Sequence, residues 1–270
     1  MKHKKIKFLS RAFTLIELLV CITVVGLLLG LAQSGYSRAL SASRRTAEVS
    51  AGKNLITAYL AAAMDNQGLV MKAYDAQGVA TDSQGNVMSG EDDHAAHRWV
   101  WRLAPYLNYQ LYGSVLVNQQ TKLIQDLGGL SQTYMVSAVP SFGLNGGFVG
   151  GNDYDEKLRK LEASGQCITR LNQASPSVIA FVSARSQAIG QNYEGFYYVT
   201  SPTYPTTWSK QYDPKGNPKV SGYVSARYDQ KAVVARLDGG VEVLSFDELK
   251  DMRRWSKDAY QQNNPNYQPK

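Results

Sequence analysis

A single carboxylate inside a long apolar run is the first residue of this chain whose type and position predict chemistry. Glu17 is the only charged side chain in residues 13–32. As a helix, that run would be roughly 30 Å long, enough to cross a bilayer. Charges inside such a span are costly and rare, so Glu17 is a candidate functional residue. Its own span holds no cation, and we therefore expect its partner to come from another chain.

The residues before the apolar run determine its expected orientation. Five basic residues and no acidic one precede it: Lys2, Lys4, Lys5, Lys7 and Arg11. Such an excess of positive charge keeps an N-terminus in the cytoplasm. A secretory signal peptide is the competing interpretation, but its apolar core is shorter, about 7–15 residues, and its small-residue cleavage site follows the core. Here the small residue Ala12 precedes the core, and cleavage after it would leave a free amine on Phe13, four residues before Glu17.

These features meet in the string Phe13-Thr14-Leu15-Ile16-Glu17-Leu18-Leu19-Val20. It resembles the N-terminus of type IV pilins and type II secretion pseudopilins. The resemblance implies that a prepilin peptidase cuts between Ala12 and Phe13 and methylates the new amine of Phe13. It also implies that Glu17 is the assembly carboxylate, neutralised by the amine of a neighbouring subunit. Ala12 departs from the family, which usually has Gly before the cut.

The resemblance also implies partners and a location. The partners would be the prepilin peptidase, other pilin or pseudopilin subunits and an inner-membrane assembly platform. The precursor would cross the inner membrane once, with its N-terminus cytoplasmic and its globular domain periplasmic, before joining a filament. The net charge of +7 does not indicate nucleic acid, because the leader supplies five of the 29 basic residues and leaves 24 against 22 acidic ones.

Other residues give little indication of catalysis or metal binding. We expect no enzyme and no cofactor, because the chain has no Gly-x-Ser-x-Gly elbow, no His-Glu-x-x-His pattern and no dinucleotide fingerprint. The weak candidates for a metal site lie together in one acidic segment: Asp92, Asp93, His94 and His97. A solvated loop that caps the next helix is the preferred interpretation of that segment.

The two cysteines are expected to stay apart. Cys21 lies in the apolar span and Cys167 in the exported part, so no intramolecular disulfide is predicted. Cys167 is expected to be a buried apolar residue, and a thiol pairing between subunits is the alternative.

The predicted domain organisation has four parts. Residues 1–12 form the basic leader, residues 13–66 a long helix with its transmembrane segment at 13–32, residues 67–260 an exported globular α+β domain, and residues 261–270 a disordered tail. Beyond the membrane, apolar residues recur at helical spacing at Leu40, Ala47, Ala51, Leu55 and Tyr59, while charged residues fall on other faces: Arg38, Arg44, Arg45, Glu48 and Lys53. The alternative is two helices with a break near residues 33–35.

The rest of the chain predicts an antiparallel sheet against this helix. The expected strands are residues 177–182, 195–200, 222–228, 232–237 and 241–244, with a hairpin turn at Asp238-Gly239-Gly240. A helix containing Trp99 should anchor the core. The glycines in the segment 141–147 suggest backbone with positive φ. Ser245 and Glu248 have the spacing of a capping box for a helix running to about Tyr260.

Two further segments resemble a large pseudopilin subfamily. They are residues 99–107, with Trp, Leu, Pro, Tyr and Leu in its order, and residues 141–145, which are similar to its Ser-Tyr-Gly-x-Asn segment. That subfamily ends in a His followed after nine residues by Asp-Gly. Here Asp238-Gly239 is retained and Tyr228 replaces the His, so the hairpin should survive while any role of the His does not carry over.

Together these observations predict a pilin-like α+β protein, with a long N-terminal helix packed on an antiparallel sheet. The expected function is a structural subunit, a pseudopilin or minor pilin, of a type II secretion or type IV pilus-like filament. The alternative is a membrane-anchored exported binding protein that does not polymerise, which would explain the span but not Glu17.

Overall fold

The computed structural model of the chain describes residues 14–127, 131–188, 191–202 and 208–269. The chain divides into two compact units, Met1–Ser43 and Arg44–Lys270. Helix α1 spans Leu15–Asp65, so its first part belongs to the first unit and its second part to the second unit. The long N-terminal helix and the mostly antiparallel sheet confirm the predicted α+β fold. The alternative of two helices with a break near residues 33–35 does not hold, because α1 runs through these residues.

Helix α1 ends at Asp65, and the residues that follow cap it. Gln67 and Gly68 adopt left-handed φ angles of 53° and 81°, and the Gly68 N–H donates to the Ala63 carbonyl at 2.7 Å. This bond spans one residue more than a helical bond and closes the last turn as in a Schellman motif. Within the second unit the helix buries a stripe of apolar residues: Ala51, Leu55, Ile56, Tyr59, Ala62 and Ala63.

The main sheet of the second unit has five strands in the order β5-β1-β2-β6-β7. They are β1 Phe142–Asn145, β2 Ile179–Ser183, β5 Tyr198–Val199, β6 Lys231–Arg236 and β7 Val241–Ser245. All pairings are antiparallel except the parallel pairing of β1 with β5. Strands β3 Arg185–Ala188 and β4 Gln191–Glu194 form a separate two-stranded ribbon. The predicted hairpin joins β6 to β7, with Gly239 in the left-handed region at φ 82°.

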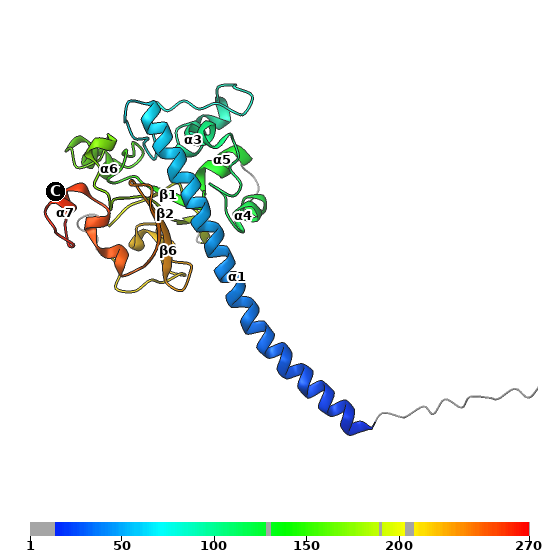
Figure 1. Cartoon of the computed structure of the whole chain (residues 1–270). Coiled ribbons are helices and arrows are strands. Elements are labelled where there is room, and N and C mark those ends of the chain that lie inside the picture. Colours follow the sequence, from blue (N-terminus) through cyan, green and yellow to red (C-terminus); the bar gives the residue numbers. More distant parts are fainter. Residues whose placement is uncertain (1–13, 128–130, 189–190, 203–207, 270) are drawn as a thin grey trace, which may run out of the picture. The chain divides into compact units, whose positions relative to one another are not determined.

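Helix α1 packs on this sheet through its buried apolar stripe (Figure 1), and Trp99 contacts the sheet as well. A Cβ placed on Gly52 would lie 3.4–3.5 Å from Val241 of β7 and Phe142 of β1, so the helix crosses the sheet there. The rings of Tyr59 and Trp99 meet Phe181 of β2 edge-on, at centroid distances of 5.2 and 5.1 Å. These buried aromatic contacts form the centre of the core.

Short helices lie before, between and after the strands. They are α2 Asp93–Ala96, α3 Trp99–Leu103, α4 Gln120–Leu127, α5 Gln132–Ala138, α6 Glu156–Ala163 and α7 Lys257–Gln261, with 3₁₀ turns η1 Gly90–Asp92, η2 Ala104–Leu107, η3 Leu171–Gln173, η4 Pro218–Ser221, η5 Glu248–Lys250 and η6 Met252–Arg254. Trp99 anchors α3 in the core, where its Nε1–H donates to the Tyr197 carbonyl at 2.6 Å.

The predicted strand at residues 222–228 is wrong. Gly222 and Tyr223 have φ angles of 61° and 63°, which are incompatible with extended backbone. Gly222 ends the 3₁₀ turn η4, and only an isolated bridge joins Val224 to Ala184. The segment instead directs Ser225, Arg227 and Tyr228 toward the interior.

The glycines of the segment 141–147 have a different cause from the one predicted. Gly143, Gly146 and Gly147 do not adopt left-handed φ, and Phe142–Asn145 is strand β1. A Cβ on Gly143 would lie 2.7 Å from the Tyr198 carbonyl carbon and from Val199. Gly143 is therefore needed for the close approach of β5 to β1.

The C-terminal segment also differs from the prediction. The Ser245–Glu248 capping box forms, with a Ser245 Oγ to Glu248 Oε2 distance of 2.7 Å, but it begins only η5, and the expected helix is divided into η5, η6 and α7. Residues 261–269 are bonded to the domain instead of forming a free tail. The Met252 N–H donates to the Pro265 carbonyl at 3.0 Å and the Tyr267 hydroxyl to Gln166 Oε1 at 3.0 Å.

Gly143→Ala should destabilise the domain by about 1–3 kcal/mol, because the new methyl group would separate β5 from β1. Urea unfolding of the purified protein measures this loss. Gly52→Ala is the matched control, since its Cβ meets ordinary packing distances and alanine favours a helix. Equal stability of Gly143→Ala and the parent would show that the strand pairing does not depend on this approach.

Candidate functional site

Glu17 lies in the first turn of α1 and is bonded to the residue before that helix. The Thr14 N–H and hydroxyl both donate to Glu17 Oε2, at 2.9 and 2.8 Å, and the Glu17 N–H donates to Thr14 Oγ1 at 3.3 Å. This reciprocal arrangement is a capping box, and the positive end of the helix dipole also favours a carboxylate there. The helix start therefore holds the carboxylate in a defined position.

This geometry revises the expectation that Glu17 is supported only by a cation. Neutral donors of Thr14 already satisfy one carboxylate oxygen, and Glu17 occupies a helix end instead of a helix centre. Within the part of the chain that the structure describes, Oε1 accepts no hydrogen bond, and the residue is exposed. A cation brought by another molecule would therefore find one oxygen of Glu17 open.

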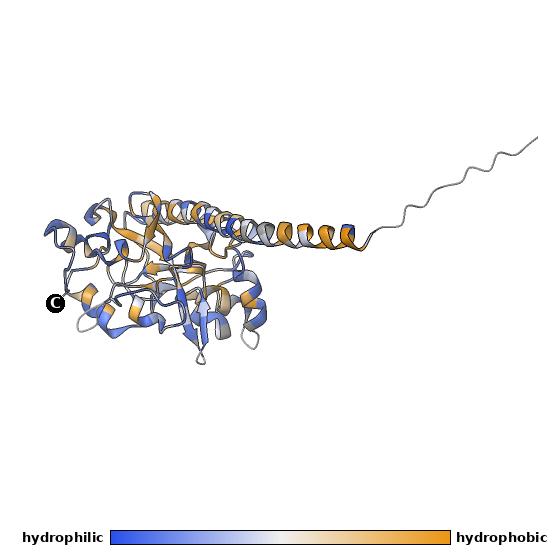
Figure 2. Cartoon of the chain, turned by 90° about the horizontal axis from the view of Figure 1, so that it is seen from below, coloured by the Kyte–Doolittle hydropathy of each residue, from blue (hydrophilic) through white to orange (hydrophobic). Residues whose placement is uncertain are grey.

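The apolar residues on both sides of Glu17 are exposed as well. Leu15 is 82% exposed and Leu27 70%, and the same holds for the other large side chains of this half of the helix: Ile16, Leu18, Leu19, Val20, Ile22, Val24, Val25, Leu28 and Leu29. Among the described residues, α1 alone is long and apolar enough to cross a membrane, and its most apolar stretch is unburied. Figure 2 shows this hydrophobic stretch in the N-terminal part of the helix. Such a surface needs lipid or other apolar helices as its environment.

The remaining residues of the predicted processing site cannot be placed. Ala12 and Phe13 lie outside the described residues, so the cleavage and methylation positions rest on the sequence alone.

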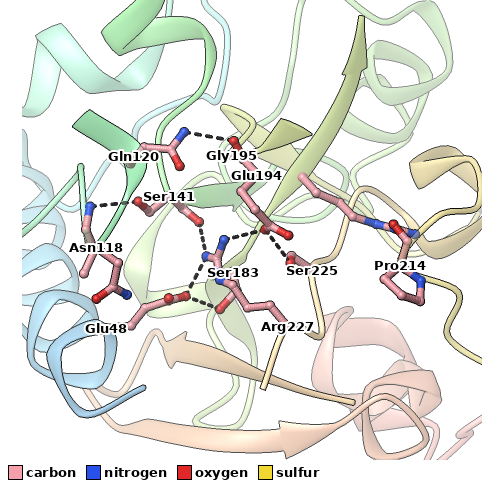
Figure 3. Close-up of polar contacts among 12 residues, drawn as sticks. Glu48, Asn118, Gln120, Ser141, Ser183, Glu194, Gly195, Pro214, Ser225 and Arg227 are labelled. Atoms are coloured by element: carbon pink, nitrogen blue, oxygen red, sulfur yellow. Dashed lines mark hydrogen bonds and ion pairs between the residues drawn. The ribbon is translucent and has the colours of Figure 1, made fainter. Parts of the chain in front are cut away.

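A second carboxylate of α1 lies in the interior of the globular unit, where the sequence analysis did not place it. Glu48 is 1% exposed. Arg227 Nη2 donates to its Oε1 at 2.7 Å, the Ser183 hydroxyl donates to the same oxygen, and the Tyr228 hydroxyl donates to Oε2. Figure 3 shows the first two of these donors converging on Glu48 from β2 and from the segment before β6. These contacts join α1 to strand β2 and to the segment before β6.

Arg227 extends this cluster to the surface. Its Nη1 donates to Glu194 Oε2 at 2.6 Å, and its Nη2 also donates to the Ser141 carbonyl at 2.9 Å (Figure 3). The Ser225 hydroxyl donates to the same oxygen of Glu194 at 2.6 Å. Burial alone would lower the pKa of the Arg227 guanidinium, but the carboxylates of Glu48 and Glu194 outweigh it and raise that pKa. The guanidinium thus stays charged between two carboxylates.

Tyr228, which the sequence resemblance places at the pseudopilin subfamily's His, takes part in this cluster. Burial raises the pKa of its hydroxyl, and the neighbouring Glu48 carboxylate raises it further. The hydroxyl therefore remains protonated and donates to Glu48, while the Asn118 amide donates to it at 3.1 Å. Tyr228 is therefore a hydrogen-bond donor to Glu48, and its protonation state does not change near neutral pH.

Sequence periodicity could not reveal the role of Glu48. It placed Glu48 with Arg44 and Lys53 on the polar faces of the helix, because a charged residue is ordinarily solvated. The sequence did contain a signal, because the spacing of Glu48 disagrees with its charge. Glu48 lies three residues before Ala51 and seven before Leu55, so it shares the helix face that is buried.

The candidate metal ligands do not form a ligand set. Asp92 accepts a hydrogen bond from the Ser131 hydroxyl at 2.8 Å, and His97 Nε2 lies 3.3 Å from Asp93 Oδ2. The rings of His94 and His97 are 6.3 Å apart. Among the described residues no three His, Cys, Asp or Glu side chains converge in a way that could hold a metal ion.

Both cysteines are free thiols. Cys167 is 2% exposed, as predicted for a buried apolar residue, and burial raises the pKa of its thiol to about 12. A thiol of that pKa is unreactive near neutral pH.

Comparison with known sequences identifies the N-terminal segment. A family model described as a prokaryotic N-terminal methylation motif matches residues 8–32, which contain Ala12, Phe13 and Glu17. Searches of curated proteins and of solved structures returned no match. The motif indicates a type IV pilin-like protein that a prepilin peptidase processes. It covers about a tenth of the chain and therefore concerns the leader and the apolar helix, not the globular unit.

Glu48→Gln should lower the free energy of unfolding by about 3 kcal/mol, because it removes the buried anion that Arg227 and two hydroxyl groups face. Chemical unfolding followed by circular dichroism measures the change. Glu156→Gln removes an exposed ion pair with Lys160 and should leave stability unchanged. A Glu48→Gln protein as stable as Glu156→Gln would contradict the structural role of the cluster.

Proposed function

We propose that this chain is a structural subunit, a pseudopilin or minor pilin, of a type II secretion or type IV pilus-like filament. The observation that carries the proposal is the position of Glu17. Within the matched methylation motif, it stands at the start of an unburied apolar helix, and none of the described residues donates to its second carboxylate oxygen. In a protein that only needed an anchor, this carboxylate would serve as a helix cap and nothing more, at the cost of a charge in the span.

The proposed sequence of events starts in the inner membrane. The basic leader stays in the cytoplasm and the globular unit lies in the periplasm. A prepilin peptidase cuts between Ala12 and Phe13 and methylates the new amine of Phe13. An assembly platform in the inner membrane then passes the subunit into a growing filament. The role in this scheme is structural, and no catalysis is assigned to the chain.

Assembly into a filament gives Glu17 and the apolar helix new contacts with neighbouring subunits. The ammonium of Phe13 in one subunit pairs with Glu17 of a neighbour, which fixes the register between helices. Thr14 keeps its bonds to the other carboxylate oxygen, so the helix start need not unfold to accept the cation. Most of the association free energy comes from the apolar residues that follow, because they are many and the ion pair is single.

Mass spectrometry of the mature N-terminus tests the processing step. We expect a chain that begins at Phe13 with one added methyl group, because residues 8–32 match the methylation motif. Protein from cells that lack the peptidase is the control and should begin with the leader. A chain that retains its leader in cells with active peptidase would favour the alternative, an anchored binding protein that does not polymerise.

Glu17→Val should leave membrane insertion and processing intact but prevent entry into filaments, because valine cannot receive the neighbouring amine. Shearing of cells followed by immunoblotting separates assembled from membrane-bound protein. Thr23→Val is the matched control, since the Thr23 hydroxyl bonds only to the helix's own carbonyls of Leu19 and Val20. Equal amounts of the Glu17 and Thr23 variants in the sheared fraction would refute the register role.

A further inference from the structure

An aromatic-lined cavity lies on the globular unit, and none of its lining residues bonds to Glu48 or Arg227. Its volume is about 240 Å³. It is formed by α3, the loop that follows η2 and the first turns of α5, and α3 and α5 are neighbours in the fold (Figure 1). The lining residues are Trp101, Tyr109, Leu111, Tyr112, Leu116, Gln132, Thr133 and Val136.

The cavity has an apolar floor and an aromatic wall. Leu111, Leu116 and Val136 are 5%, 3% and 5% exposed and form the buried side. Tyr112 is 58% exposed and stands at the opening. An exposed tyrosine beside a concave apolar surface offers an apolar ring face on which a ligand can pack.

The rings are held in place before any ligand arrives. Trp101 Nε1 donates to the Thr133 carbonyl at 3.0 Å, which ties α3 to α5. The Tyr109 hydroxyl is 2.8 Å from that of Thr81, and the backbone of Tyr109 is left-handed, at φ 57°. Such conformations are costly for a residue with a side chain and persist only when the surroundings fix them. A preformed aromatic wall spares a ligand the entropy cost of ordering it.

The polar groups of the cavity define the chemistry of the ligand. None of the lining residues is charged, so a charged ligand would lose hydration without gaining a counter-charge. The rim carries the Gln132 amide, which donates to the Tyr112 hydroxyl at 3.3 Å, and the Thr133 hydroxyl, for which the described residues provide no hydrogen-bond partner. A ligand that fits has one apolar face for the rings and hydroxyl groups for the rim.

We propose that this cavity binds a single ring of a neutral sugar. The C–H face of a pyranose packs on aromatic rings, and its hydroxyl groups bond to amides and hydroxyls such as those of Gln132 and Thr133. The volume lies just below the usual range for small-molecule sites, about 300–1,000 Å³, which suits one ring better than a longer ligand. The site would allow the exported unit to bind a neutral glycan, and it is independent of filament assembly.

Saturation-transfer NMR on the full chain tests the proposal. The protein is kept in an amine-oxide detergent, because a glycoside detergent would compete, and the probes are glucose, galactose, mannose and N-acetylglucosamine. We expect one or more of these sugars to bind. Tyr112→Ala should weaken that binding about tenfold through the lost ring face. Thr133→Val should weaken it about three- to tenfold through the lost hydroxyl, while keeping the carbonyl that holds Trp101.

Tyr154→Ala is the control, because Tyr154 is also an exposed tyrosine, at 71%, but does not line the cavity. It should bind sugar as the parent does. Absence of binding by all four sugars to the parent would overturn the proposal, as would equal affinity of the Tyr112→Ala and Tyr154→Ala proteins. A proline- or aromatic-rich peptide that binds at Tyr112 when no sugar does would assign the cavity to a protein partner instead.

Discussion

The globular unit depends on a buried carboxylate that fixes the long helix to its sheet. Glu48 meets a guanidinium and two hydroxyl groups, and its partners come from β2 and from the segment just before β6. Apolar packing of Leu55 and Tyr59 favours contact with the sheet but tolerates sliding along the helix axis, because apolar contacts have little directionality. The bonds to Glu48 have defined directions and so specify one register. An unpaired Glu48 or Arg227 in this interior would be strongly unfavourable, and both must therefore be in place together.

The two carboxylates of helix α1 illustrate how environment determines role. Glu48 is saturated by donors from its own chain and acts within the molecule. Glu17 is bonded only by Thr14 among the described residues and keeps one oxygen open to solvent or to another molecule. The same type of side chain thus stabilises the fold within the second half of the helix and is suited to association at the start of the helix. The intervening helix has a continuous hydrogen-bonded backbone, as expected from a sequence without proline before Pro105.

The parts of the fold that follow from periodic sequence patterns were predictable. The stripe of α1, the Trp99 helix and the hairpin at Gly239 each depend on signals within a few residues. The close approach at Gly143 was not predictable, because the atoms that require a glycine belong to β5, more than fifty residues later in the chain. The cluster around Glu48 was missed for the same reason. In the functional site, Glu17 could be recognised from the sequence since an isolated charge in an apolar run is a local signal, whereas its bonds to Thr14 required coordinates.

The separation of Glu48 from Arg227 along the chain, 179 positions, has a consequence for biogenesis. When a polypeptide crosses a membrane from its N-terminal end, the helix that carries Glu48 emerges long before the Arg227 guanidinium that neutralises Glu48. Strands β6 and β7 emerge later still, so the sheet has no complete surface for the helix until most of the chain has crossed. Domains dominated by such distant contacts fold slowly. If the globular unit is exported as proposed, the emerging precursor would expose its apolar stripe throughout translocation and would depend on the export machinery or a chaperone to shield it.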